Sequence, residues 1–289
     1  MLTLAADKKA FGRNWARSAQ ALARLPGKPE RSASQQARAE EILADSRASR
    51  ATFMRRHARA VYDALTKKRT EFVRVDELCA RAAKAFPGLV PDAKTLARDS
   101  GKLQKEKDGA EIDQGIFLSH VMTDPECGLH LCHAMLLPHP RTKSFLSKFV
   151  SSGKITFPGA TVERRGKACV VTLSNPRFLN AEDETTIEGT EIAVDLALLD
   201  PQTEICVLRG GPVEHPKWKD QRLFGAGINL THLYQGKIRY LWYIVRDLGL
   251  VNKIYRGLAK PDVSPEVDSV EKLWIGAIEG FAIGGHCQT

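Results

Sequence analysis

The stretch "EICVLRGG", residues 204–211, decides the fold of this chain. Residues Ile205 to Leu208 form an unbroken apolar run, and two glycines close the stretch. A short apolar run bounded by turn residues is typical of a strand that is buried on both faces of a sheet. Such strands occur in parallel sheets with helices packed against them, so the stretch predicts an α/β domain.

The sequence on both sides fits this prediction. Before it, "TVERRGKACVVTLSNP" (161–176) predicts two short strands around a turn at Arg165-Gly166, and residues 182–200 predict a helix that opens with acidic residues. After it, a helix is expected at about 236–258 and a further buried strand within 271–285. This order of strand, helix, strand, helix, strand predicts a sheet that binds ligands at the carboxyl ends of its strands.

The first half of the chain has a different texture. Residues 35–69 are rich in Ala, Arg, Glu and Leu with apolar residues at three- and four-residue steps, and 75–86 ends at a Pro-Gly pair. Further helices are expected at 93–106, 112–135 and 140–150. The pattern changes at Ser151-Ser152-Gly153. We therefore expect an α/β (α+β) protein with a helical N-terminal domain, residues 1–152, and a second domain, residues 153–289.

The charge is basic but gives no sign of a nucleic-acid site. The 289 residues include 43 Lys and Arg against 34 Asp and Glu, a net charge of +9. The basic residues crowd into segments such as "RRHAR" (55–59) and "TKKRTEFVR" (66–74), interleaved with Ala and Glu at helical spacing and without a run of aromatics. Solvated helix faces explain this pattern better than nucleic-acid binding.

The cysteines and the N-terminus predict a soluble, cytoplasmic protein. "MLTLAADKKAFGRNW" (1–15) has no secretory leader, and no apolar run reaches the 18 to 20 residues or so that span a bilayer. We expect no membrane partner and reduced thiols. The six cysteines are at positions 79, 127, 132, 169, 206 and 287.

One histidine- and cysteine-rich stretch resembles a metal site at first sight. "DPECGLHLCHAMLLPHP" (124–140) contains Cys127 and Cys132, but they lie five apart, unlike the cysteine pair of a zinc knuckle. Leucines between them suit a packed helix. We therefore expect core cysteines and surface histidines here and no metal.

Two glycine turns are the better candidates for a site. "FGAGINL" (224–230) lacks the third glycine of a dinucleotide fingerprint, and no acidic residue about twenty positions later completes such a unit. Together with Gly284-Gly285-His286, however, it gives two turns that each follow an apolar segment. Glycines there can turn a backbone N–H toward a ligand, and two such groups form an oxyanion hole. From spacing alone, tight strand-to-helix turns explain them equally well.

Three stretches in this order, "NPRFLNAED" (175–183), "FGAGINL" and "IEGFAIGGHCQ" (278–288), resemble the crotonase (enoyl-CoA hydratase/isomerase) superfamily. The resemblance covers about residues 155–289 and implies an incomplete crotonase-like β-β-α spiral domain, because the fold normally continues beyond the Gly-Gly turn. It implies a C-terminally truncated chain whose intact relatives are homo-oligomers, trimers or hexamers. The helical extension, "YLWYIVRDLGLVNKIYRGL" (240–258) and Gln288 are similar to the cofactor-independent dioxygenases of glycopeptide-antibiotic biosynthesis.

Gln288 stands where the hydratases carry a catalytic glutamate. A carboxamide cannot take and return a proton, so hydration is not expected. The resemblance implies instead that (3,5-dihydroxyphenyl)acetyl-CoA and O2 become 3,5-dihydroxyphenylglyoxylate and CoA through an enolate, with no metal, flavin or other cofactor. The alternatives are another acyl-CoA hydratase, isomerase or thioesterase of the same fold, or an inactive truncated fragment.

The resemblance also implies roles for six residues. The N–H groups of Ile228 and Gly285 would form the oxyanion hole, and the side chains of Ile228 and Leu230 would make an apolar space for dioxygen. The ring hydroxyls would be held by Glu182, Arg246 and Gln288. Each of these three has a plainer alternative, namely a first-turn acid of a helix, a structural partner of an acid such as Glu279, and a solvated terminal side chain.

Overall fold

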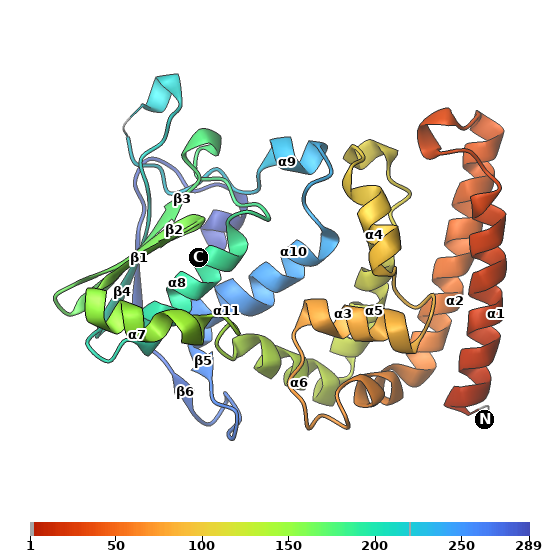
Figure 1. Ribbon diagram of the computed structural model, residues 1–289, viewed down its shortest axis with the longest axis horizontal. Coiled ribbons are helices and arrows are strands. Elements are labelled where there is room, and N and C mark those ends of the chain that lie inside the picture. Colours follow the sequence, from red (N-terminus) through yellow and green to blue (C-terminus); the bar gives the residue numbers. More distant parts are fainter. Residues whose placement is uncertain (1–2, 220) are drawn as a thin grey trace. The chain divides into compact units, whose positions relative to one another are not determined.

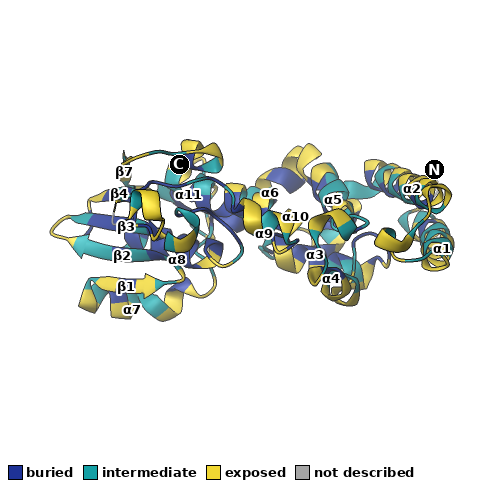
Figure 2. Cartoon of the chain, turned by 90° about the horizontal axis from the view of Figure 1, so that it is seen from above, coloured by how far each residue is buried: buried dark blue, intermediate teal, exposed yellow. Residues whose placement is uncertain are grey.

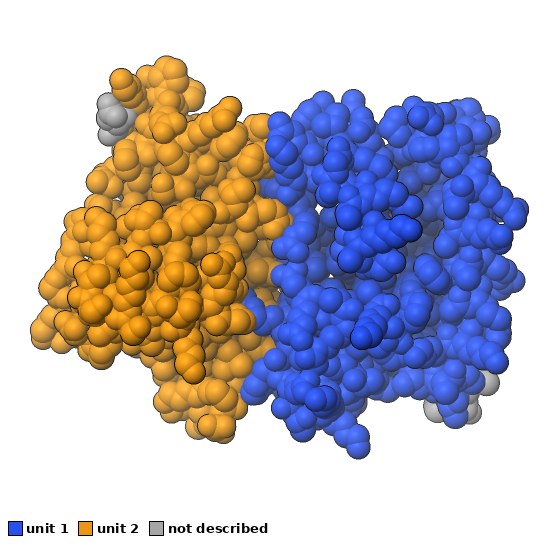
Figure 3. All heavy atoms as spheres, in the orientation of Figure 1, with its two compact units in different colours: residues 1–132, 234–241 blue, residues 133–233, 242–289 orange. Residues whose placement is uncertain are grey.

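The computed structural model describes residues 3–219 and 221–289. The chain forms two compact units, shown in blue and orange in Figure 3. Unit 1 consists of Met1–Cys132 and Tyr234–Leu241, and unit 2 of His133–Leu233 and Trp242–Thr289. The short segment Tyr234–Leu241 from the second half of the chain thus belongs to the helical unit. The division into folding domains at residues 152 and 153 stays a prediction.

Unit 1 is helical, as the composition of the first half predicts. Its helices are α1 (Leu4–Ala23), α2 (Ala33–Leu65), α3 (Val75–Ala85), α4 (Ala93–Ser100), α5 (Ile112–Thr123) and the first part of α6 (Pro125–Leu136), all labelled in Figure 1. The long helix α2 begins at a capping box between Ser32 and Gln35, which satisfies two free backbone N–H groups. In the described part of the chain, no helix combines the length and apolar character needed to cross a membrane.

The single helix predicted for 112–135 is wrong in one respect, because the structure breaks it into α5 and α6. Asp124 between them has an extended conformation, with φ −83° and ψ 116°. The cause is Pro125, whose ring disfavours the helical conformation at the preceding residue. Asp124 instead caps α6, with its carboxylate accepting from the backbone N–H of Cys127 at 3.1 Å.

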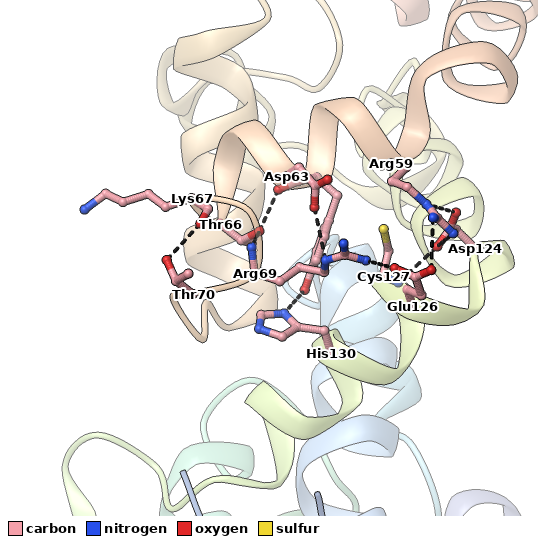
Figure 4. A network of polar contacts seen from close by, with 11 residues as sticks. Arg59, Asp63, Thr66, Lys67, Arg69, Thr70, Asp124, Glu126, Cys127 and His130 are labelled. Atoms are coloured by element: carbon pink, nitrogen blue, oxygen red, sulfur yellow. Dashed lines mark hydrogen bonds and ion pairs between the residues drawn. The ribbon is translucent and has the colours of Figure 1, made fainter. Parts of the chain in front are cut away.

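A polar network fastens the C-terminal end of α2 to the start of α6 (Figure 4). Arg59 donates from Nε to Asp124 at 2.9 Å, and Arg69 pairs with Glu126. Further along, the hydroxyl of Tyr62 hydrogen-bonds Nδ1 of His130 at 2.8 Å. The prediction of surface histidines in this stretch is therefore wrong for His130, which is half-buried and bonded because α6 turns it toward α2.

Unit 2 contains a five-stranded sheet in the order β1-β2-β3-β4-β7. Strands β1, β2 and β3 pair antiparallel, whereas β3, β4 and β7 run parallel. The quoted apolar stretch becomes β4, which lies between two parallel neighbours as its composition predicts. The strands are β1 (Lys154–Phe157), β2 (Gly159–Arg165), β3 (Ala168–Ser174), β4 (Ile205–Gly210) and β7 (Leu273–Ala277), and β5 (Leu258–Ala259) pairs with β6 (Ser269–Val270) in a separate ribbon.

Helix α8 packs against this sheet over β1, β2 and β3, and α7 packs against β1. Helix α8 connects β3 to the parallel strand β4, and Figure 2 draws it mostly in the dark blue of buried residues. The core contains side chains of α8 such as Ile192 and Leu196 together with Val171 and Leu208 of the sheet. The helices of this part are α7 (Thr142–Ser152), α8 (Ile187–Leu199), α9 (Leu230–Tyr234), α10 (Tyr240–Val245) and α11 (Asn252–Arg256), with a π-helix over Arg246–Val251. The mixed fold class with a helical N-terminal part is confirmed.

Candidate active site

The two glycine turns lie side by side. Because β4 and β7 are parallel neighbours, the segments that follow them leave the sheet at the same edge. The N–H of Gly225 donates to the carbonyl of Phe281 at 3.1 Å, and the N–H of Ile283 donates back to Gly225 at 3.0 Å. A Cβ added to Gly227 would lie 3.7 Å from the Cα of Gly284. Spacing in the sequence leaves this juxtaposition open, and the structure shows it.

The amide of Ile228 is turned away from its neighbouring strand segment. Ile228 and Glu182 form an isolated parallel bridge, in which Glu182 N–H donates to Gly227 O and Asn229 N–H donates to Glu182 O, each at 2.8 Å. A trans peptide points its C=O and its N–H in opposite directions. The bond to Gly227 O therefore directs the N–H of Ile228 away from Glu182.

Gly285 occupies the first turn of a short 3₁₀ helix, Gly284–Gln288. Amides in a first turn have no acceptor within their own helix, so they are free to bind an outside group. A Cβ at Gly285 would lie 2.8 Å from Nη2 of Arg246 and 3.1 Å from a carboxylate oxygen of Glu182. A side chain at this position would therefore displace the ends of these two side chains.

The three predicted side chains meet in one network around Arg246. Its Nε donates to both carboxylate oxygens of Glu182 at 2.9 Å, and its Nη1 donates to Oε1 of Gln288 at 2.9 Å. Nη1 also donates to Asp247 at 2.9 Å, and Nη2 to the carbonyl of Gly285 at 2.6 Å. Arg246 and Glu182 are only 3% and 9% exposed. The low dielectric around such a buried pair strengthens each of these charge-assisted bonds.

The structure also shows where the three side chains stand with respect to their plainer alternatives, while their roles stay predictions. Glu182 lies before α8, which begins at Ile187, so it is not a first-turn acid of that helix. Arg246 does pair with acids, but with Glu182 and Asp247, whereas Glu279 is exposed. Gln288 is exposed as a residue, yet its amide oxygen is bonded.

The predicted oxygen pocket is a different matter. Leu230 is the first residue of α9 and is 70% exposed, whereas Ile228 is half-buried. The roles of both residues beside dioxygen stay predictions.

Sequence reasoning missed Asp183 and Asn229, which hydrogen-bond to each other next to the site residues Glu182 and Ile228. Asp183 is fully buried, and its carboxylate accepts from Nδ2 of Asn229 at 2.8 Å and from the hydroxyl of Thr185 at 2.6 Å. Burial opposes its ionisation, but hydrogen bonds from Thr185 and Asn229 outweigh it and keep the pKa of Asp183 below its usual value. Each residue is the chain neighbour of a site residue, Glu182 or Ile228, and that adjacency was the available signal.

Comparisons with known proteins agree with the motifs. No protein-family model matches the chain. The (3,5-dihydroxyphenyl)acetyl-CoA 1,2-dioxygenase of Amycolatopsis orientalis is 41% identical over 283 residues, which are 98% of this chain and 65% of that protein. The short-chain-enoyl-CoA hydratase of Clostridium acetobutylicum is 26% identical over 128 residues, 44% of this chain and 41% of that protein. A solved enoyl-CoA hydratase/isomerase from Xanthobacter autotrophicus Py2 is 19% identical over 46% of this chain and 43% of that chain, with a TM-score of 0.35.

The chain therefore spans less than two thirds of the length of both curated relatives. Within that span, the similarity to the dioxygenase runs along nearly all of this chain. The resemblance predicted from the three quoted stretches is confirmed: the chain is similar to the dioxygenase along nearly its whole length and, over less than half of it, to a short-chain-enoyl-CoA hydratase.

Proposed function

We propose that the chain belongs to a dioxygenase that converts (3,5-dihydroxyphenyl)acetyl-CoA and O2 to 3,5-dihydroxyphenylglyoxylate and CoA without a metal or organic cofactor. The similarity to the enzyme of Amycolatopsis orientalis supports this substrate class. The structural observation that supports it best is the contact of Arg246 with Gln288, Glu182 and the carbonyl of Gly285. A cation, a neutral amide and the backbone turn at Gly285 are then in contact with one another.

In the first step, the thioester oxygen accepts hydrogen bonds from the backbone N–H groups of Ile228 and Gly285. These donors stabilise negative charge on that oxygen, so the α-CH2 between the thioester and the aryl ring loses a proton more readily. A pair of fixed donors stabilises the enolate more than the uncharged thioester, which is the requirement for catalysis.

Arg246 supplies positive charge next to this oxyanion. Before substrate binds, Glu182 balances the guanidinium charge across two 2.9 Å contacts. The amide oxygen of Gln288 accepts a hydrogen bond from Nη1 of Arg246, and the NH2 group of Gln288 can donate to a phenolic oxygen of the substrate ring. A glutamate at this position would add a second negative charge and would oppose the phenolate-enolate. The neutral amide favours it.

In the oxidative step, the electron-rich enolate reduces O2 and forms a C–O bond at the α carbon. The terminal peroxide oxygen attacks the thioester carbonyl and expels CoA thiolate. The O–O bond then breaks as the remaining α proton leaves, and this yields the α-keto carboxylate. The two oxygen atoms of O2 and the thioester oxygen account for the three oxygens of the glyoxylate side chain. The apolar side chains of Ile228 and Leu230 are proposed to face the dioxygen.

The test is simultaneous measurement of oxygen uptake and thiol release from (3,5-dihydroxyphenyl)acetyl-CoA, with a metal chelator present. One O2 consumed per CoA released is expected. Thiol release without oxygen uptake would contradict the dioxygenase and identify a thioesterase, and hydration of a short enoyl-CoA would identify a hydratase like the Clostridium acetobutylicum relative. We further propose a cytoplasmic trimer or hexamer that acts in antibiotic biosynthesis, on the strength of the same resemblance.

A further inference from the structure

We propose that His286 is a positioning residue of the oxyanion hole, whose imidazole holds the Gly227–Ile228 turn beside the N–H of Gly285. The inference rests on the proposed function of that hole and adds a residue to it. His286 is the residue after one proposed donor, and it binds the residue before the other. One side chain therefore links the two halves of the hole.

The first observation is a buried hydrogen bond. The N–H of Gly227 donates to Nδ1 of His286 at 3.0 Å, and the imidazole residue is only 2% exposed. The carbonyl of Gly227 accepts from Glu182 N–H at 2.8 Å. Gly227 is thus held at both of its backbone polar groups, with φ at +76°. The N–H of Ile228 shares a peptide plane with that carbonyl, so the bond from Glu182 directs it, while the bond to His286 fixes the preceding peptide.

The second observation is the close packing of the ring. A Cβ added to Gly225 would lie 2.3 Å from Nε2 of His286, so the ring rests directly on that glycine. The ring of Phe224 meets the imidazole edge-on, with centroids 5.9 Å apart. The imidazole thus packs against the turn from Phe224 to Gly227 on the side of its contact with the N–H of Gly227.

The protonation state follows from the direction of this bond. Nδ1 accepts an N–H, so the ring proton must lie on Nε2, for which the described residues offer no acceptor. Burial lowers the pKa of His286, and the charge of Arg246 lowers it further while Glu182 opposes. These are the charged groups that face the ring. The neutral, accepting form is therefore the form expected at neutral pH.

The experiment compares His286→Asn with His286→Leu in the purified chain. Asn places its Oδ1 near the position of Nδ1 and can accept from Gly227, whereas Leu fills similar space without an acceptor. The first readout is exchange of the α protons of (3,5-dihydroxyphenyl)acetyl-CoA with D2O under argon. We expect His286→Leu to slow this exchange about 10- to 100-fold at saturating substrate, less than the loss of a whole donor, with little change in KM. His286→Asn should restore most of the rate.

The anaerobic readout separates this proposal from the proposed function. If exchange proceeds but no oxygen is consumed in air, the dioxygenase fails and the role of His286 is still measured. Equal exchange rates for the wild type and His286→Leu would overturn the proposal, as would equal losses in the Leu and Asn variants. The low-pH limb of the wild-type exchange profile should also be absent from His286→Asn, because an amide does not titrate.

A second measurement needs neither turnover nor a folded variant. Long-range ¹H–¹⁵N NMR of the wild-type chain at pH 7 should show a neutral His286 with its proton on Nε2. A proton on Nδ1, or a charged ring, would overturn the proposal.

Gly225→Ala should also displace the ring and slow exchange, with Gly276→Ala as the matched control, because a Cβ at Gly276 meets nothing within 4 Å.

Discussion

Nη2 of Arg246 donates to the carbonyl oxygen of Gly285 at 2.6 Å. The residue that supplies positive charge to the proposed enolate is therefore also the residue that fixes the turn of a proposed oxyanion donor. Charge and geometry in this site depend on one another. A substitution at Arg246 cannot change the first without disturbing the second.

Arg246→Lys should accordingly behave as a severe substitution. A lysine ammonium cannot bind Glu182, Gln288 and Gly285 in the planar fork that a guanidinium provides. We expect kcat/KM for oxygen uptake to fall at least about 100-fold, comparable with the loss of an oxyanion donor. Steady-state oxygen consumption would measure this, and a loss below about threefold would argue against the coupling.

Arg246→Met should also destabilise the fold, because it leaves the Glu182 carboxylate buried without its partner. Removing one member of a buried pair costs about 3–5 kcal/mol. Glu182→Gln added to Arg246→Met should recover part of that loss, because it removes the unpaired charge. Urea unfolding curves of the single and double variants would show it. A double variant no more stable than Arg246→Met would contradict the pairing.

Gln288→Glu should suppress the oxygenase without unfolding the protein. The new carboxylate would still accept from Nη1 of Arg246, but it would place negative charge where the phenolate-enolate forms. We expect kcat to fall about 10-fold or more, the cost of about 1.4 kcal/mol in the barrier. Gln288→Ala is the control, since it removes the amide without adding charge, and it should retain more activity than Gln288→Glu.

Lys253 provides a test of stability away from the proposed chemistry. Its Nζ lies 2.6 Å from Glu191 and 2.8 Å from Asp195, and all three side chains are almost completely buried. Lys253→Met leaves two buried carboxylates and should cost about 3–5 kcal/mol of unfolding free energy. The matched control is Lys260→Met, whose pair with Asp268 is about half exposed and should contribute at most about 1 kcal/mol. Equal losses of unfolding free energy in Lys253→Met and Lys260→Met would contradict the expected effect of burial on the two ion pairs.

Asp124 should make the stability of unit 1 depend on pH in the acid range. The hydrogen bond from Arg59 lowers the pKa of Asp124 to about 2, against an unfolded value of about 3.9. A carboxylate with a depressed folded pKa stabilises above the unfolded pKa, and its contribution is lost as pH falls through the folded one. Asp124→Ala should cost about 1 kcal/mol at pH 7 through loss of the α6 cap. The difference from wild type should shrink between about pH 4 and pH 2, as thermal unfolding at several pH values would show.

The succession of strands and helices in the second half of the chain was predictable because it follows from local patterns, whereas spacing alone left the meeting of the two glycine turns open. An apolar run closed by glycines predicts a strand, and two such strands in parallel bring their following turns to one edge. The predicted burial of the second strand is wrong, because Leu273 and Ile275 of β7, the last strand in the sheet order, are 65% and 47% exposed. The choice of Glu182, Arg246 and Gln288 came from resemblance to known sequences. Periodicity alone would not have joined positions so far apart in the chain.

The remaining features depend on contacts that no local pattern contains. The predicted helix at 182–200 begins only at Ile187, because Glu182 forms a bridge with Ile228 instead. Tertiary pairing therefore overrides helix propensity in its first five residues. The role of His286 requires the distance to Gly227, which lies 59 positions earlier in the sequence.

The network around Arg246 also has a consequence for the order of folding. Its bonds join residues that are 64, 42 and 39 positions apart. Closing such long loops costs chain entropy, and the bonds are gained only after the parallel strands have already brought the segments together. We therefore expect these contacts to be absent from the folding transition state. Substitutions among them should speed unfolding and leave the folding rate nearly unchanged, so the lifetime of the native state depends on the same side chains as the chemistry.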